Sequence, residues 1–317
     1  FHLLSGLREL NENSLITAVA GTWDSGGSSG RLRTELGVLP PGDIRRCILA
    51  LMENKAQKMV AQRLFDDRLN DLVGPFKGHS FGNLLTAKLE DIYKGQDRGI
   101  EAERELFRIR AKVMPVSITN VNLIAETVKG NRIVGETDID LRAKDKNYDR
   151  ADKIVRIYFD TRADANPSVL DQVKNADKII FSPGDLYTSV LPHLLVDGVK
   201  EAVAKSKAKL IYVLNLCTKP GETDSYKASD FLKAFLFYLD APGRLDSVIV
   251  NDNHLDSEIL EIYKGEGQNL VEIDDKKILE MEPKVKIIRG KISRYLIKEH
   301  LLRHDPEKLA LTILGLN

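Results

Sequence analysis

The densest run of residues suited to ligand chemistry is DSGGSSGR at positions 24–31. Glycines let the backbone turn tightly and approach a ligand, and their N–H groups can form a nest that holds an anion. Hydroxyl and guanidinium groups in the same run are donors suited to phosphate. A Gly/Ser-rich run is equally compatible with a plain surface turn. The candidate ligand residues in this run are Asp24, Gly26, Gly27, Ser28, Ser29 and Arg31.

Two further polar runs each follow a strand-like segment. Residues 182–189 come after 178–181, and residues 215–223 come after 210–214. A helix beginning near Leu186 would offer free N–H groups and its dipole to an anion. Asp185 is a candidate for a ribose hydroxyl or a metal, or serves only as the helix N-cap. The candidate ligand residues here are Gly184, Tyr187, Thr188, Ser189, Asn215, Thr218, Glu222 and Thr223.

The Gly-rich run also follows a strand-like segment, residues 15–19. Ligands of open α/β sheets bind beyond the carboxyl ends of the strands, which meet at one edge. We therefore expect residues 24–31, 182–189 and 215–223 to converge on one pocket that takes a nucleotide-type ligand.

Further candidates lie in a helix-rich stretch. Asp43 follows a Pro-Pro-Gly turn and is placed to cap a helix, and Arg45, one turn into that helix, is the better candidate for a ligand contact. His79 and Asn83 belong to the run GHSFGN at 78–83. His79 is a candidate acid/base or phosphate contact, while a helix capped by Ser80 is the alternative. No spacing of His, Cys and carboxylates resembles a zinc or iron ligand set.

The composition indicates an ordinary globular chain. Among 317 residues, 47 Lys and Arg balance 47 Asp and Glu, which argues against a nucleic-acid or membrane-surface partner. Cys47 and Cys217 lie in apolar runs, so we expect a reducing compartment and no disulfide. No run approaches a membrane span and no leader is recognisable, which predicts a cytoplasmic protein. The chain opens inside a predicted helix, 1–10, and we expect a short segment before it.

Short β-branched runs alternate with amphipathic helical patterns along most of the chain. This alternation predicts a single α/β domain over 1–317, a three-layer α/β/α sandwich with a mostly parallel, Rossmann-like sheet. The predicted strands are 15–19, 154–159, 178–181, 210–214, 247–250 and 284–288. The predicted helices are 167–176, 198–206, 229–239, 257–263 and 306–316.

One long stretch departs from the alternation. Residues 43–110 contain three or four amphipathic helical patterns and no convincing strand, which predicts a helical insertion that covers one end of the sheet. After it, residues 114–127 and 131–139 predict a small β-hairpin around Lys129 and Gly130. The charged residues 144–152 predict a surface loop.

Together these runs resemble the gluconeogenesis factor (YvcK) branch of the 2-phospho-L-lactate transferase (CofD-like) superfamily. Residues 26–33 are similar to its GGSSGRLR signature, and 37–45, 78–85, 183–196 and 215–224 follow in the family's order. The resemblance covers nearly the whole chain and implies an α/β sheet that binds UDP-N-acetylglucosamine or a similar UDP-sugar. It also implies that Tyr263 and Arg303 contact the UDP-sugar.

The resemblance implies a regulator linked to cell shape, cell-wall synthesis and growth on gluconeogenic carbon sources. The alternative is an enzyme like the other branch, which uses Mg²⁺ to move a phospho-lactyl group from a nucleotide-linked donor. Asp24 would then be the catalytic candidate. The usual Asp-Asp pair is Asp24-Ser25 here, which removes one carboxylate and favours the regulator. The expected partners are a sugar nucleotide, proteins of cell-wall synthesis and a second copy of the chain.

Other departures concern the loops around the site. The usual GPGS run is replaced by Ser182-Pro183-Gly184-Asp185, and a threonine phosphorylated in some members is Pro306 here. The family's first strand and its Gly-rich loop would lie before Phe1.

Overall fold

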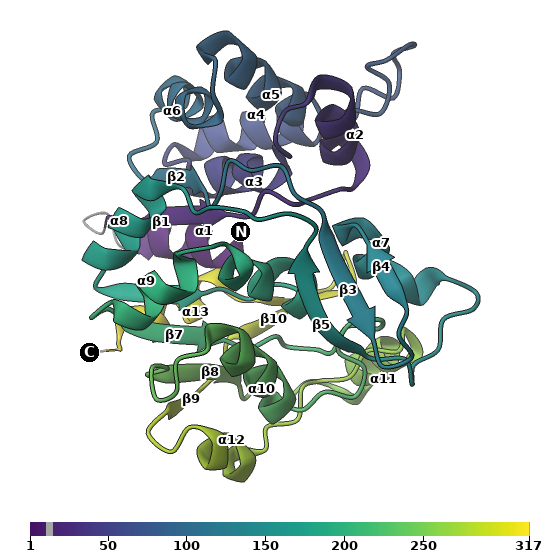
Figure 1. Ribbon diagram of the computed structural model, residues 1–317, viewed down its shortest axis with the longest axis vertical. Coiled ribbons are helices and arrows are strands. Elements are labelled where there is room, and N and C mark those ends of the chain that lie inside the picture. Colours follow the sequence, from purple (N-terminus) through teal and green to yellow (C-terminus); the bar gives the residue numbers. More distant parts are fainter. Residues whose placement is uncertain (11–14, 317) are drawn as a thin grey trace.

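The computed structural model describes residues 1–10 and 15–316, and its largest sheet has four parallel strands. The strands are β6 (Lys178–Phe181), β7 (Lys209–Val213), β8 (Ser247–Asn251) and β9 (Lys286–Gly290), in that spatial order. Figure 1 labels three of them, β7, β8 and β9, in the lower part of the molecule. All three pairings are parallel. The four runs predicted as strands of a parallel sheet are confirmed, and β7 and β8 are the buried pair at its middle.

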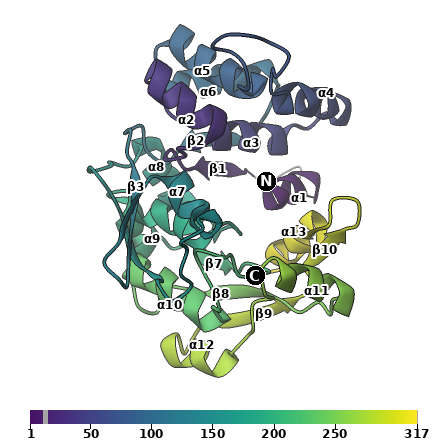
Figure 2. The same ribbon diagram turned by 90° about the vertical axis from the view of Figure 1, so that its right-hand side faces the viewer.

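Helices cover both faces of this sheet (Figure 2). Tyr212 of β7 points to one face, where its ring stacks on Phe235 of α10 (Ala228–Leu239) with 4.5 Å between the centroids. The neighbouring Ile211 and Val213 point to the other face and pack with Leu3 and Leu309. Because side chains alternate along a strand, one apolar run serves both faces. The predicted three-layer α/β/α sandwich is confirmed.

The covering helices come from both ends of the chain. On the first face α10 is joined by α8 (Pro167–Asn175) and α9 (Val199–Lys205), as Figure 2 shows. On the second face lie α1 (His2–Leu10) and α13 (Pro306–Leu314). A Cβ on Gly6 of α1 would come within 1.9 Å of the Pro306 carbonyl oxygen, so only glycine permits this approach of the two helices.

A group of helices sits at one end of the molecule over a second, smaller parallel pair of strands (Figure 1). The strands are β1 (Thr17–Ala20) and β2 (Lys112–Pro115). Ile44 and Ile48 are fully buried in a cluster that includes Ala18 of β1 and Val113 of β2. The predicted helical insertion is confirmed. Its helices are α3 (Gly42–Leu51), α4 (Lys55–Asp66), α5 (Phe81–Tyr93) and α6 (Gln96–Leu106).

One predicted parallel strand belongs elsewhere. The run 154–159 forms β5 (Ile154–Phe159), which pairs antiparallel with β3 (Leu123–Thr127) in a separate three-stranded sheet. Val155 is 53% exposed and its neighbour Arg156 is also exposed, so this strand is not buried on both faces. Its assignment to the parallel sheet is therefore wrong.

The predicted hairpin around Lys129 and Gly130 is confirmed by the antiparallel pair β3 and β4 (Arg132–Val134). Its predicted bounds were too wide at both sides. Met114 lies in β2, and the segment after β4 is the short helix α7 (Glu136–Asp140), followed by the 3₁₀ turn η1 (Arg142–Lys144).

The remaining elements lie around the carboxyl ends of the parallel strands and toward the C-terminus. A π-helical turn η2 (Leu186–Val190) and a 3₁₀ helix η3 (Leu191–Leu195) replace the α-helix expected near Leu186. The helices α11 (Ser257–Gly265) and α12 (Asp275–Met281) precede a hairpin of β10 (Ser293–Leu296) and β11 (Leu301–His304), which the sequence analysis did not predict. Among the described residues, no helix has the length and hydropathy needed to cross a membrane.

Candidate functional site

Three polar segments meet beyond the carboxyl ends of β1, β6 and β7. The Trp23 indole N–H, after β1, donates a hydrogen bond of 2.7 Å to the Thr188 carbonyl oxygen, after β6. The Asn215 amide, after β7, donates one of 2.8 Å to the Gly184 carbonyl oxygen. These contacts join residues 182–189 to Asn215 and to Trp23, which directly precedes the run 24–31. That all three runs converge on one ligand pocket stays a prediction.

The Gly-rich run forms the start of a helix rather than a free loop. Helix α2 (Gly27–Leu36) begins directly after Gly26, and no side chain caps its N-terminus. The Gly26 N–H donates to Asp24 Oδ1 at 2.8 Å, which fixes the entry into the helix. A Cβ on Gly30 would lie 2.0 Å from the Ser25 carbonyl oxygen, so this position also requires glycine. The first turn of α2 therefore presents backbone N–H groups directly after the loop that follows β1, together with the positive end of the helix dipole.

The serines of this turn face inward. Ser28 and Ser29 are each 4% exposed. Ser28 Oγ lies 3.0 Å from His79 Nδ1, and Ser29 Oγ accepts a hydrogen bond of 3.2 Å from the Asn83 amide. Ser80 caps α5 by accepting the Asn83 N–H, which confirms the capping alternative at this run.

His79 is itself 1% exposed, and burial lowers its pKa, so the ring is neutral near pH 7. His79 and Asn83 thus hold the first turn of α2 against α5. Their direct contact with a ligand remains a prediction.

Two predicted arginines contact oxygens of the helical group, and their contact with a ligand stays a prediction. Arg31 donates hydrogen bonds of 2.8 Å to the carbonyl oxygens of Lys77 and Pro75. Arg45 donates to the Phe65 carbonyl oxygen at 2.9 Å and pairs with Asp66 at 3.1 Å. In this arrangement both guanidinium groups are engaged by protein oxygens.

The carboxylates of the site come partly from residues that the sequence analysis did not select. Glu222 accepts the Tyr187 N–H and the Thr188 hydroxyl, both at 2.9 Å. Lys219 Nζ pairs with Asp185 at 2.7 Å and also with Asp140 of α7. Asp185 makes no capping hydrogen bond to η2, so its interpretation as an N-cap is wrong.

Lys219 belongs to the run 215–223, which the sequence indicated as part of the site. Asp140 lies 79 residues before Lys219, so no spacing in the sequence indicated that the two would pair. Glu136, in the same short helix α7 as Asp140, lies near the carboxylates of Asp24 and Asp140. Burial raises the pKa of Glu136 to about 7, and the carboxylates of Asp24 and Asp140 add to the effect.

Two predicted threonines fasten the loop after β7. Thr218 Oγ1 accepts the Asn269 N–H at 3.0 Å, and Thr223 Oγ1 accepts the Lys219 N–H at 2.8 Å. Tyr187 is buried and its hydroxyl lies 2.8 Å from that of Tyr226. These side chains shape the loops. The half-buried or exposed candidates that remain accessible at the convergence are Asp24, Gly26, Gly27, Gly184, Ser189 and Asn215.

Tyr263 and the strand that carries Arg303 pack against the loop after β7. The Tyr263 ring is 7% exposed and packs with Leu216 and Leu302, while its hydroxyl accepts the Leu302 N–H. Arg303 is exposed on β11. Although burial raises the pKa of Cys217 to about 12, the nearby charge of Arg303 acts to lower it. Leu302 packs in one cluster with Leu216 and Cys217, so the neighbouring Arg303 follows a residue that is seated on this loop, and Tyr263 holds the strand that carries it.

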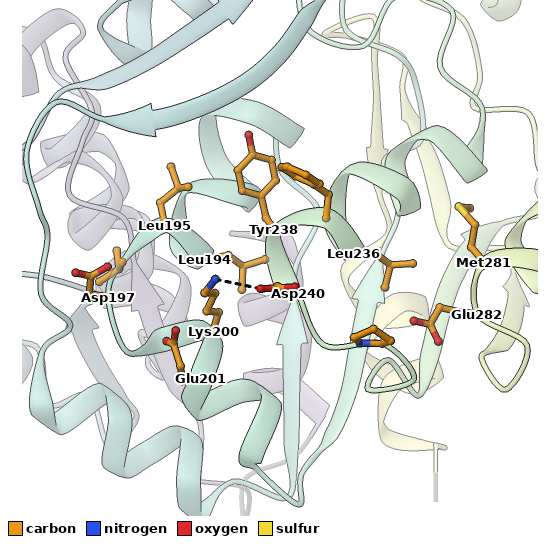
Figure 3. Close-up of a pocket in the computed structure, with 13 residues that line it drawn as sticks. Leu194, Leu195, Asp197, Lys200, Glu201, Leu236, Tyr238, Asp240, Met281 and Glu282 are labelled. Carbon is orange, nitrogen blue, oxygen red and sulfur yellow. Dashed lines mark ion pairs between the residues drawn. The ribbon is translucent and has the colours of Figure 1, made fainter.

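A cavity of about 650 Å³ lies elsewhere, among η3, α9, α10 and α12 (Figure 3). Leu194, Leu236 and Met281 are among its lining residues, and Lys200 pairs with Asp240 at 3.6 Å within it. None of the candidate ligand residues predicted from the sequence lines this cavity.

Comparisons with known proteins agree with this fold. The family model described as 2-phospho-L-lactate transferase CofD matches residues 2–293. A chain from Thermotoga maritima is 43% identical over 87% of this chain and 83% of its own length. The gluconeogenesis factor of Bacillus subtilis is 35% identical over 99% of this chain and 93% of its own length.

A relative from a Nostoc species is longer, and this chain spans 65% of it. A crystal structure of a Bacillus halodurans protein superposes with a TM-score of 0.89 at 34% identity, covering 99% of this chain and 95% of that one. The chain belongs to the CofD family, among relatives named gluconeogenesis factors.

Proposed function

We propose that this chain is a regulatory protein that binds a sugar nucleotide of the UDP-N-acetylglucosamine type in the cytoplasm. The observation that carries the proposal is that the loops after β1, β6 and β7 contact one another, and that the loop after β1 leads directly into the uncapped N-terminus of α2. Backbone N–H groups and the helix dipole favour a diphosphate at that point.

The remaining groups at this edge suit the hydroxyl-bearing parts of such a ligand. Asp24 and Asp185 offer carboxylate oxygens that accept hydrogen bonds from ribose or sugar hydroxyls, and Asn215 Oδ1 makes no hydrogen bond to any residue that the structure describes. The helix N-terminus suits the phosphates of a sugar nucleotide, and the carboxylates and the carboxamide suit its hydroxyl groups. A bare phosphate would leave the carboxylates and the carboxamide without partners.

Arg303 supplies a cation to the same ligand in this proposal. Its guanidinium is exposed on β11, beside the loop that carries Cys217. A guanidinium can hold a diphosphate through two parallel, charge-assisted hydrogen bonds. Tyr263 contributes by fixing β11 through the hydrogen bond from the Leu302 N–H.

The regulatory part of the proposal rests on the relatives named gluconeogenesis factors. We propose a role in cell shape and cell-wall synthesis during gluconeogenic growth, with proteins of cell-wall synthesis and a second copy of the chain as partners. Function on a shared fold depends on the site, so this assignment needs its own test.

The second candidate is a Mg²⁺-dependent transferase of the phospho-lactyl type. The matching family model bears the transferase's description, and Asp24 and Glu136 place carboxylates beside the N-terminus of α2. Carboxylate oxygens are the ligands that Mg²⁺ prefers. The ion would offset the charge of a nucleotide-linked donor, while Asp24 and Glu136 would hold it.

Calorimetry and thermal denaturation with UDP-N-acetylglucosamine, UDP, GDP and NAD test the proposed ligand. A ligand at one hundred times its Kd adds roughly 2.7 kcal/mol to the free energy of unfolding. We expect this stabilisation with the UDP-sugar and little with NAD. Absence of binding by every UDP compound would refute the proposal.

A turnover assay separates the two candidates. The protein is incubated with Mg²⁺ and UDP-N-acetylglucosamine, and released UDP is followed by chromatography. We expect an intact ligand. Sustained UDP release that the Asp24→Asn substitution abolishes would support the enzyme instead.

A further inference from the structure

Lys219 lies among three carboxylates that come from three separate segments. Its Nζ pairs with Asp185 at 2.7 Å, with Glu222 at 3.0 Å, and with Asp140. Asp140 ends α7, Asp185 follows β6, and Glu222 follows β7. One ammonium group therefore joins the small antiparallel sheet region to two loops of the parallel sheet.

The three carboxylates are close enough to need a cation. One oxygen from each of Asp140, Asp185 and Glu222 lies within 4.8 Å of the others. Like charges at this separation repel strongly in a partly buried place unless a positive charge lies among them. Lys219 supplies that charge, with its side chain 23% exposed.

The cluster has little freedom to rearrange. The Glu222 side chain is fully buried, and its two oxygens accept hydrogen bonds from Tyr187 and Thr188. Lys219 itself is held by the turn that Thr223 closes. Although burial disfavours a charge at Lys219, the carboxylates of Glu222 and Asp185 raise its pKa, so the ammonium form persists.

We propose that Lys219 is a tethered cation that occupies the place a divalent ion would otherwise take among Asp140, Asp185 and Glu222. An ammonium group has three N–H donors, one for each carboxylate, and is covalently part of the fold. A divalent ion would recruit the same oxygens and complete its shell with water or ligand. If the proposed function holds, this side of the ligand site works without a divalent ion.

Removing the Lys219 ammonium group should allow a divalent ion to bind among the three carboxylates. With Mn²⁺ as the probe, calorimetry on the full chain should show that Lys219→Gln binds one more ion per chain than the wild type. The extra site should disappear in the double variant Lys219→Gln/Asp140→Asn. Lys219→Arg, which keeps a cation, should match the wild type. No gain of Mn²⁺ binding by folded Lys219→Gln would overturn the proposal.

A second comparison needs no change at Lys219 and therefore remains decisive if that variant does not fold. Wild type and Asp140→Asn should bind the same number of Mn²⁺ ions, because Lys219 already fills the cluster. Fewer ions in Asp140→Asn would mean that a metal displaces Lys219, and the proposal would be wrong. No sugar nucleotide is present in these titrations, so their outcome is independent of the ligand assays.

Discussion

The Trp23 indole N–H donates a 2.7 Å hydrogen bond to the Thr188 carbonyl oxygen and so joins the loop after β1 to the turn after β6. Both residues are buried, and the indole also packs edge-on against His193 with 4.9 Å between the ring centroids. This contact connects the helical group to the parallel sheet at the candidate site.

Replacing Trp23 by Phe keeps most of the ring contacts but removes the donor. The Thr188 carbonyl oxygen then loses this hydrogen bond in a buried place, which costs about 1–3 kcal/mol. We expect the free energy of unfolding, measured by urea denaturation and circular dichroism, to fall by that amount. An unchanged midpoint and slope would show that the two loops are held by other contacts.

A substitution at Gly30 tests whether the close approach of Gly30 to the Ser25 carbonyl oxygen requires glycine. Gly30→Ala would place a Cβ 2.0 Å from the Ser25 carbonyl oxygen, so the helix start must shift, at a cost of roughly 1–3 kcal/mol. Gly265→Ala in α11 is the matched control, since its Cβ meets nothing within 4 Å. We expect thermal denaturation to show a clear loss for Gly30→Ala and none for the control.

Arg303→Ala should weaken UDP-N-acetylglucosamine binding about tenfold or more, because charge-assisted hydrogen bonds to the diphosphate are lost. Stability should be maintained, since Arg303 lies directly opposite Arg294 in the hairpin and like charges there repel. Calorimetry measures the affinity. Arg98→Ala, at an exposed position on α6, is the control. Equal affinities for both variants would remove Arg303 from the site.

Glu103 should make the stability of the helical group depend on pH. The side chain is fully buried in α6, and one oxygen accepts the Thr86 hydroxyl at 2.9 Å. The other oxygen has no hydrogen-bond partner in the described part of the chain. Burial raises the pKa of Glu103 from 4.5 to about 7. The folded chain therefore holds this proton more tightly than the unfolded chain. Protonated Glu103 therefore contributes fully to the free energy of unfolding below pH 4.5, and this contribution is lost as the pH rises from 4.5 to about 7.

Glu103→Gln should remove this decline, which amounts to about 3 kcal/mol for a shift of this size. Urea denaturation between pH 5 and pH 8 measures it as the widening difference between variant and wild type. Glu105→Gln, at an exposed position of the same helix, should leave the wild-type profile unchanged. Parallel profiles for wild type and Glu103→Gln would contradict the prediction.

Local patterns in the sequence determined much of this molecule. Uninterrupted apolar runs such as 210–214 predicted strands buried on both faces, because each alternate side chain needs an apolar partner. Residues 129–130 predicted the hairpin from turn chemistry, and the polar runs after the strands predicted where three segments would meet. The strands and the hairpin are properties of short segments, and tertiary packing agreed with them.

Only the tertiary structure determined which strands pair with one another and which side chains form hydrogen bonds and ion pairs. The run 154–159 is as β-branched as a central strand, yet its pairing with β3 was not visible from its own residues. Arg31 and Arg45 looked available for phosphate, but carbonyl oxygens of the helical group engage both. The ion pair of Lys219 with Asp140 exists only because the chain between them folds back, and charge pairing depends on distance in space rather than in sequence.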